Sequence, residues 1–180
     1  MYKTTGDMVG STRNLIRDNI ASAKNLTNQK FWQTRNLLSG AKLEAAKASH
    51  LIKACIMDQN LQFAKIQRAN FVPCRGNFSS LVELRKQILQ LKQVTVNLVP
   101  GCIHLNPLES EMENLRLCLS TKIIDLQTQL LLLEQKFADN VKNVVNLSTN
   151  CVTRETGDVH TKLGAVEGAV KNCKNTQRLH

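Results

Sequence analysis

Residues 80–98 read SLVELRKQILQLKQVTVNL. Five apolar residues and one threonine recur in this stretch at alternating intervals of three and four residues, which places them on one face of an α-helix. Ser80 and Glu83 form a capping-box pair that predicts the start of the helix, and Pro100-Gly101 predicts its end. The seam consists of Leu81, Leu84, Ile88, Leu91, Thr95 and Leu98.

A second long helix is predicted to follow, with Asn106 as its N-cap, Pro107 at the first helical position and Glu109 at the third. Its apolar seam extends from Leu108 to Phe137 and beyond. A further apolar stripe, which repeats every seven residues, lies beside this seam. A helix with two apolar stripes is expected to contact neighbours on both sides. The second stripe consists of Leu117, Ile124, Leu131, Ala138 and Val145.

The N-terminal region keeps the same helical spacing from Ile16 to Ile66, and only Ser39-Gly40 interrupts it. Residues 7–69 therefore fit either one very long helix or a hairpin of two helices. A single glycine costs only about 1 kcal/mol inside a helix, and the alanine-rich stretch Ala41 to Ala54 favours continuity.

Near the C-terminus a shorter seam runs from Val159 to Cys173, and Gly164 and Gly168 within it predict close packing against another helix. The whole pattern predicts an all-α fold, a long-helix antiparallel bundle of four to five helices stapled by disulfides. Residues 1–70 are expected to form a basic long helix or helical hairpin, and residues 71–180 a disulfide-linked helical bundle. The two parts are expected to form one continuous domain.

Six cysteines are spread singly along the chain, and none forms a C-x-x-C pair, which argues against a zinc knuckle or a redox-active pair. An even number of dispersed cysteines predicts three disulfides and an oxidising compartment, so we expect a secreted, extracellular protein. Six cysteines allow 15 pairings, among which an antiparallel layout favours Cys74 with Cys173. The candidates are Cys55, Cys74, Cys102, Cys118, Cys151 and Cys173.

Other features also bear on the compartment. The N-terminus, Met1 to Gly6, lacks the apolar segment of a signal peptide, and we interpret the chain as a mature fragment with an added methionine. The most apolar stretch, Ile123 to Leu133, is too short and too polar to cross a bilayer, so no transmembrane segment is expected. Three Asn-x-Ser/Thr sequons predict a glycoprotein, with glycosylation candidates Asn25, Asn77 and Asn146.

The sequence offers no pattern typical of an enzyme. Neither glycine-rich phosphate loop occurs, nor does a nucleophile elbow. Glu109, Glu111 and Glu113 are expected to complement the dipole of a helix start rather than to act as acid and base. We therefore expect no catalysis, no cofactor and no metal. The four histidines lack metal-ligand spacing and are expected at the surface or at helix caps: His50, His104, His160 and His180.

Charge is the global property with a functional consequence. The 180 residues contain 24 Lys and Arg against 14 Asp and Glu, a formal net charge of +10. Residues 1–70 alone carry +7, which would attract anionic lipid, glycosaminoglycan or nucleic acid. Nucleic acid is the least favoured of these partners, because the basic residues stand singly rather than in dense stripes.

Four cysteines, Cys74, Cys102, Cys118 and Cys151, lie in about 110 residues of Leu- and Val-seamed helix. This pattern resembles the insect TsetseEP-type secreted domain of fly gut proteins, over about Phe63 to Cys173. The resemblance implies an extracellular, non-catalytic protein. It leaves Cys55 and the basic N-terminal helix at or outside the edge of the domain.

Three functions follow from these features as hypotheses. The first is an extracellular binding module for a host, microbial or self surface, acting through the basic N-terminal helical region. The second is a carrier that encloses lipid or a small apolar ligand between its helices. The third is a structural protein that self-associates through long helices. Phe31 and Trp32 are either an exposed anchor for a partner protein or a pair of core rings.

Overall fold

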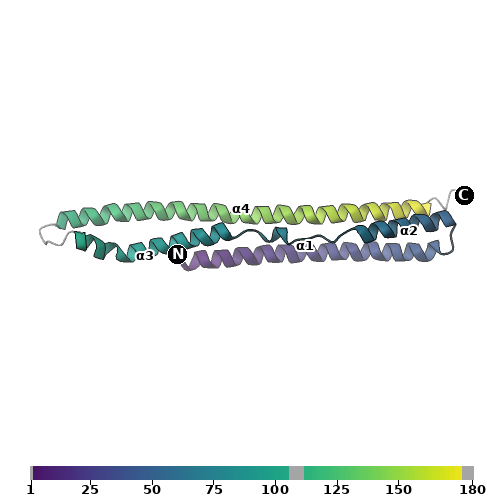
Figure 1. Cartoon of the computed structure of the whole chain (residues 1–180), viewed down its shortest axis with the longest axis horizontal. Coiled ribbons are helices and arrows are strands. Elements are labelled where there is room, and N and C mark those ends of the chain that lie inside the picture. The colour runs from purple at the N-terminus through teal and green to yellow at the C-terminus, as the bar shows by residue number, and fades with distance from the viewer. Residues whose placement is uncertain (1, 106–111, 176–180) are drawn as a thin grey trace. The chain divides into compact units, whose positions relative to one another are not determined.

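The computed structural model describes residues 2–105 and 112–175, and these residues are almost entirely helical and contain no strand. The all-α class with long helices and three disulfides is confirmed. Figure 1 labels the four long helices. They are α1 (Tyr2–Ala45), α2 (His50–Lys65), α3 (Ser79–Leu105) and α4 (Met112–Asn175), and a short 3-10 helix, η1 (Pro73–Arg75), precedes α3.

The chain forms two compact units, each of which combines segments of three helices. Unit 1 contains Met1–Leu15 and Gly76–Asn146, and unit 2 contains Ile16–Arg75 and Leu147–His180. The helices α1 and α4 contribute to both units. Each unit thus takes residues from both sides of position 70.

The core of unit 2 follows the seam that the sequence predicts for α1. Every seam position from Ile16 to Ala45 is buried. Ile52 and Ile56 of α2 and Val166 and Val170 of α4 pack into one cluster with the α1 seam. The buried α1 positions are Ile16, Ile20, Ala23, Thr27, Phe31, Thr34, Leu38, Ala41 and Ala45.

The N-terminal region forms a hairpin, and its break lies at residues 46–49, not at Ser39-Gly40. The expectation of continuity from Ala41 to Ala54 was wrong. Ser49 takes an extended conformation before α2, with φ of −58° and ψ of 158°. Folding back at this point lets α2 bury Ile52 and Ile56 against α1, which outweighs the helical propensity of a few alanines.

Two disulfides connect the elements of unit 2 to α4. Cys55 of α2 is bonded to Cys173, with 5.9 Å between the Cα atoms, and Cys74 of η1 is bonded to Cys151, with 5.4 Å. The favoured pairing of Cys74 with Cys173 was wrong. It placed Cys173 at the level of the Cys74 loop, whereas Cys151 lies there and Cys173 is on the same helix, roughly 33 Å further along at 1.5 Å per residue.

In unit 1, both predicted ends of α3 were wrong. The helix begins at Ser79, where the side-chain oxygen of Asn77 accepts the Ser79 N–H at 2.9 Å, so the Ser80–Glu83 capping box does not mark its start. The helix also continues through Pro100 to Leu105. Leu98 and Cys102 are buried on either side of Pro100, and this packing carries the helix past the missing N–H.

The third disulfide and a small core hold unit 1 together. Cys102 is bonded to Cys118, with 6.0 Å between the Cα atoms, which joins the end of α3 to the start of α4. The guanidinium of Arg13 lies over the Phe78 ring, 5.1 Å from its centre, so the first part of α1 packs beside α3. The buried residues of this unit are Val9, Thr12, Leu81, Ile88, Leu98, Cys102, Phe137 and Val144.

α4 is a single helix of 64 residues, and it contains the second predicted helix from Met112 onward together with the C-terminal one. The N-terminal signals Asn106, Pro107 and Glu109, together with Glu111, lie outside the described residues. The second apolar stripe of α4 does not pack against a neighbouring helix along its whole length, because Leu117, Ile124 and Leu131 are exposed.

Gly164 and Gly168 do not mark a close helix contact, as the sequence suggested. Both are exposed, and a Cβ atom at either position would have no heavy atom within 4 Å outside the helix. Leu163, Val166 and Val170 provide the packing on the other side of the helix.

Replacing both glycines by alanine, Gly164→Ala with Gly168→Ala, should stabilise the protein by roughly 0.5–1 kcal/mol per site, because alanine restricts the unfolded chain and nothing opposes its methyl group. The contrasting variant is Gly76→Ala. Gly76 has φ of +76°, so alanine there should destabilise by about 1–2 kcal/mol. Urea unfolding with intact disulfides measures both. Destabilisation by the α4 pair would show that Gly164 and Gly168 do pack against a neighbour.

Candidate functional site

Unit 2 carries nearly all of the net charge. It contains 15 Lys and Arg against six Asp and Glu, a formal net charge of +9, whereas unit 1 contains nine against eight, a net charge of +1. Along the sequence, most of the excess lies in residues 1–70, which carry +7. The fold gathers it instead in one unit, because α4 returns with basic residues of its own, including Lys162 and Lys171.

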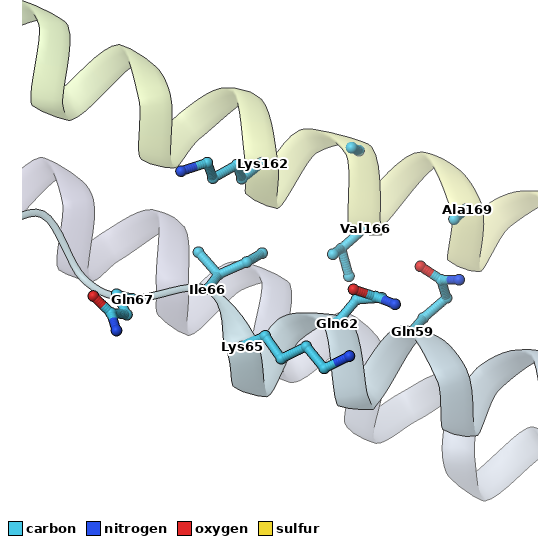
Figure 2. Close-up of a pocket in the computed structure, with 9 residues that line it drawn as sticks. Gln59, Gln62, Lys65, Ile66, Gln67, Lys162, Val166 and Ala169 are labelled. Carbon is cyan, nitrogen blue, oxygen red and sulfur yellow. The ribbon is translucent and has the colours of Figure 1, made fainter.

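A groove of about 660 Å³ lies between the end of α2 and α4 within unit 2. Figure 2 shows Val166 and Ile66 pointing toward the space between the two elements, with Gln59 and Gln62 beside them. Lys65 and Lys162 border it from α2 and α4. The remaining lining residues are Gln67, Ala165 and Ala169. The groove therefore combines an apolar floor with amide and ammonium donors; we name it the α2/α4 groove.

A second groove, of about 400 Å³, lies between α1 and the end of α2, and Ile66 lines both grooves. We name it the tryptophan groove because Trp32, which is 66% exposed, forms part of its wall. Arg35 and Arg68 also line it, and the Arg68 guanidinium lies over the Phe31 ring, 5.4 Å from its centre. Lys65 and Lys162 in one groove and two arginines in the other thus surround the end of α2.

The two aromatic residues that the sequence singled out have different roles. Phe31 is buried and meets Phe63 edge to face, with 5.7 Å between ring centres. Trp32 is the exposed member of the pair. Because adjacent residues on a helix point about 100° apart, one ring can anchor α2 to α1 while the other faces outward.

A polar network joins α1 to α4 within unit 2. The Lys30 ammonium donates to Glu167 at 2.7 Å, and the buried Thr34 hydroxyl donates to the other carboxylate oxygen at 2.6 Å. Burial raises the pKa of Glu167, but the hydrogen bonds from Lys30 and Thr34, with the charges of Lys30 and Lys171, outweigh it and hold that pKa below its ordinary value. Glu167 is therefore ionised at neutral pH and is positioned by its partners.

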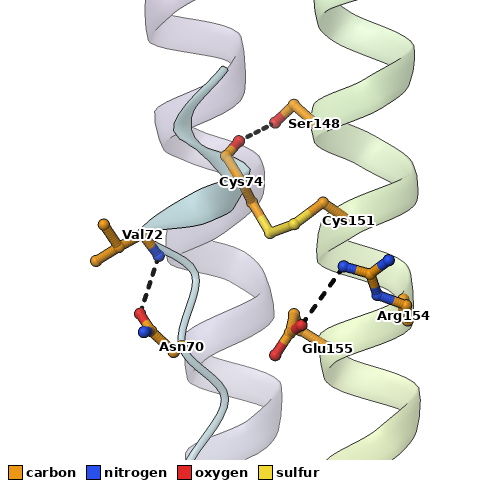
Figure 3. Close-up of a disulfide and its surroundings, with 7 residues drawn as sticks. All are labelled: Asn70, Val72, Cys74, Ser148, Cys151, Arg154 and Glu155. Atoms are coloured by element: carbon orange, nitrogen blue, oxygen red, sulfur yellow. Dashed lines mark hydrogen bonds and ion pairs between the residues drawn. A yellow bond between two sulfur atoms is a disulfide. The ribbon is translucent and has the colours of Figure 1, made fainter. Parts of the chain in front are cut away.

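The segment that follows Ile66 is held against α4 by the Cys74–Cys151 disulfide (Figure 3). The Ser148 hydroxyl donates to the Cys74 carbonyl at 2.6 Å, and both residues are buried. The Asn70 side chain accepts the Val72 N–H at 3.1 Å and forms a local turn. These contacts fix a segment without regular structure, which positions Gln67 and Arg68 at the grooves.

The other residues that the sequence singled out are dispersed. His50 and His104 are exposed and His160 is half-buried, with a buried Nε2 that has no partner among the described residues; His180 lies outside them. Asn25 and Asn146 are exposed within helices, and Asn77 is exposed before α3. In the described part of the chain, no cluster of three His, Cys, Asp or Glu is arranged to hold a metal ion. Nor does any described helix have a stretch long and apolar enough to span a membrane.

The sequence did not identify the grooves. Their cations stand far apart in the chain, and the only local signals were the basic excess and the Phe31-Trp32 pair. Lys65 and Lys162 are brought together by the turn at 46–49 and by the Cys55–Cys173 disulfide, neither of which could be derived from periodicity.

Comparison with known proteins does not add a relative. No family model matches the chain, and neither a curated protein nor a solved structure does.

Glu167→Gln should destabilise the protein by roughly 1–3 kcal/mol at neutral pH, because it removes the charge that Lys30 and Thr34 stabilise. Since the folded-state pKa of Glu167 is lowered, this stability is present above the unfolded pKa and is lost as pH falls through the folded value. The difference from wild type should therefore shrink below about pH 4.

Urea unfolding over a pH series measures this difference, with the exposed Glu83→Gln as control, for which the change should be small throughout. A difference between Glu167→Gln and wild type that does not vary with pH would contradict the charged network.

Proposed function

We propose that this protein is an extracellular, non-catalytic binding module that binds an anionic surface through unit 2. The observation that carries the proposal is the charge of +9 on unit 2, with two lysines and two arginines lining adjoining grooves at the end of α2. A long-range positive potential of this kind raises the local concentration of an anionic partner and speeds its association.

The α2/α4 groove supports short-range binding as well. Charged groups interact more strongly beside apolar walls than in open water, and Ile66, Val166 and two alanines provide such walls next to Lys65 and Lys162. The glutamine amides add neutral hydrogen-bond donors that suit sulfate, phosphate or carboxylate oxygens.

The tryptophan groove extends this surface with groups of a different kind. Arg35 and Arg68 present planar guanidinium groups that can contact oxyanions in pairs of hydrogen bonds. Trp32 offers an exposed ring with apolar faces beside them. We infer that the partner carries anionic groups on a partly apolar framework, as an acidic polysaccharide or an anionic lipid headgroup does.

The compartment is part of the same proposal. Three disulfides support an oxidising environment, and the exposed Asn77 sequon lies outside the helices, where a glycan would not disturb a packed face. Secretion, glycosylation and the resemblance to the insect TsetseEP-type domain remain predictions. The carrier of lipid or a small apolar ligand is the alternative; ligand mass retained in native mass spectrometry would favour it.

Wild-type protein should be retained on immobilised heparin at low salt and elute as salt screens the charges. Lys65→Gln with Lys162→Gln should elute earlier. On vesicles that contain phosphatidylserine, the same pair should bind roughly 30-fold more weakly, since each lysine contributes about 1 kcal/mol near an anionic surface. The matched control is Lys122→Gln with Lys136→Gln, which makes the same charge change in unit 1.

Flow-through of the wild type at low salt would contradict the proposal. If the control pair weakened binding as much as Lys65→Gln with Lys162→Gln does, the loss would depend only on net charge, and this would contradict the role of the grooves. Heparin retention without vesicle binding would indicate an acidic polysaccharide, and the reverse would indicate a lipid headgroup.

A further inference from the structure

The three Asn-x-Ser/Thr sequons of the chain have different environments in the folded protein. Each sequon consists of an asparagine, one intervening residue and a residue with a hydroxyl group. The hydroxyl is part of the acceptor signal, so an oligosaccharide transferase must contact the asparagine amide and the hydroxyl at the same time. The sequons are Asn25-Leu26-Thr27, Asn77-Phe78-Ser79 and Asn146-Leu147-Ser148.

The first sequon lies within α1, where its amide and its hydroxyl face opposite sides of the helix. Each residue of a helix adds a rotation of about 100°, so side chains two residues apart point about 200° apart. Asn25 is exposed, whereas Thr27 is buried and its hydroxyl donates to the Ala23 carbonyl at 2.8 Å. A transferase that contacts the Asn25 amide therefore cannot contact the Thr27 hydroxyl.

The third sequon, within α4, has the same arrangement. Asn146 is exposed and Ser148 is buried. The Ser148 hydroxyl donates to the Cys74 carbonyl at 2.6 Å, next to the Cys74–Cys151 disulfide (Figure 3). This hydroxyl is thus occupied by a contact that holds the chain segment around η1, and it lies on the side of α4 away from the Asn146 amide.

The Asn77 sequon lies at the start of α3, and its geometry is different. The side-chain oxygen of Asn77 accepts the Ser79 N–H at 2.9 Å, which forms an Asx turn. The turn brings the Asn77 amide group and residue 79 together, and both residues are exposed. The amide nitrogen and the hydroxyl of this sequon can therefore be contacted from one side.

Neighbouring residues hold this turn in place. Gly76 has φ of +76°, a conformation that glycine adopts readily, and it turns the chain directly before Asn77. The half-buried Phe78 ring lies under the Arg13 guanidinium, which is 5.1 Å from the ring centre. The middle residue of the sequon thus packs against α1, while the two residues on either side of it stay exposed.

The same distinction is expected while the chain is being synthesised. A local helix forms within about a microsecond, whereas synthesis adds roughly 5–20 residues per second. The helices α1 and α4 contain 44 and 64 residues, so both exceed the length at which isolated helices are marginal. The sequons inside them should be helical before a transferase acts on them.

We propose that Asn77 alone carries an N-linked oligosaccharide, and that Asn25 and Asn146 stay unmodified. The inference rests on the extracellular compartment of the proposed function, because this transfer takes place in the secretory pathway. The donor is an oligosaccharide bound to a lipid pyrophosphate. The Asn77 Nδ2 atom bonds to C1 of the first sugar as the bond from C1 to the pyrophosphate oxygen breaks. The amide nitrogen loses one proton, and the lipid pyrophosphate leaves.

The proposed site lies outside the unit that carries the two grooves. Asn77 belongs to unit 1, whereas Asn25 belongs to unit 2, whose net charge is +9. A glycan on Asn77 is therefore attached to the nearly neutral unit, and binding of an anionic partner through unit 2 should not depend on it.

Secretion of the full chain from a mammalian cell line, behind a cleavable signal peptide, tests the inference. Peptide-N-glycosidase F in heavy-oxygen water converts each glycosylated asparagine to labelled aspartate, and peptide mapping locates the label. Only Asn77 should be labelled. The intact wild type should lose the mass of one glycan and Asn77→Gln should lose none. The matched control, Asn25→Gln with Asn146→Gln, should lose as much as the wild type.

A second variant, Ser79→Ala, keeps Asn77 but removes the hydroxyl, and it should also carry no glycan. Mapping of the wild type does not depend on the folding of either variant. Label at Asn25 or Asn146, or an Asn77 without label, would overturn the inference. Heparin retention of the same samples tests the proposed function separately: flow-through of wild type and Asn77→Gln alike would contradict binding through unit 2 and leave the labelling result standing.

Discussion

The bonds that α4 makes to α2 and to the segment after it are the constraint on which unit 2 depends. α2 has only 16 residues and buries two of them, so its packing alone would hold it weakly. Cys55–Cys173 fixes it near its start, and Cys74–Cys151, with the Ser148 hydrogen bond, fixes the chain beyond its end. In the chain-entropy account, a disulfide that closes a loop over a separation of 77 residues lowers the entropy of the unfolded chain and raises its free energy by roughly 4–5 kcal/mol.

This anchoring also explains how a strongly basic unit can hold its charges close together. A net charge of +9 repels itself and opposes a compact state. The two disulfides of unit 2 hold it together against that repulsion, so its Lys and Arg side chains need not be neutralised in ion pairs. Of the lysines in the unit, Lys30 and Lys174 form ion pairs with Glu167 and Glu44. Lys65 and Lys162 at the α2/α4 groove make no ion pair within the described residues, and this leaves them available to a partner.

Much of the fold could be predicted because burial imposes a period on the sequence. Each α1 seam position from Ile16 to Ala45 is buried, as the spacing of three and four predicts. The helix ends were not predictable in this way. Pro100 and the turn at 46–49 are decided by packing partners that lie far along the chain. The buried Leu98 and Cys102 keep α3 helical past Pro100. The packing of Ile56 against α1 favours a turn within an alanine-rich stretch whose propensity alone would continue the helix.

The candidate site was less predictable, because it depends on which cysteines pair. If the six cysteines were paired differently, with Cys74 bonded to Cys173, then Lys65 and Arg68 would have different neighbours. Peptide mapping of the unreduced protein by mass spectrometry therefore tests the account most directly. It should find three linked peptides, which join Cys55 to Cys173, Cys74 to Cys151 and Cys102 to Cys118, with no free thiol. A peptide that links Cys74 to Cys173, or six thiols that alkylate without reductant, would contradict it.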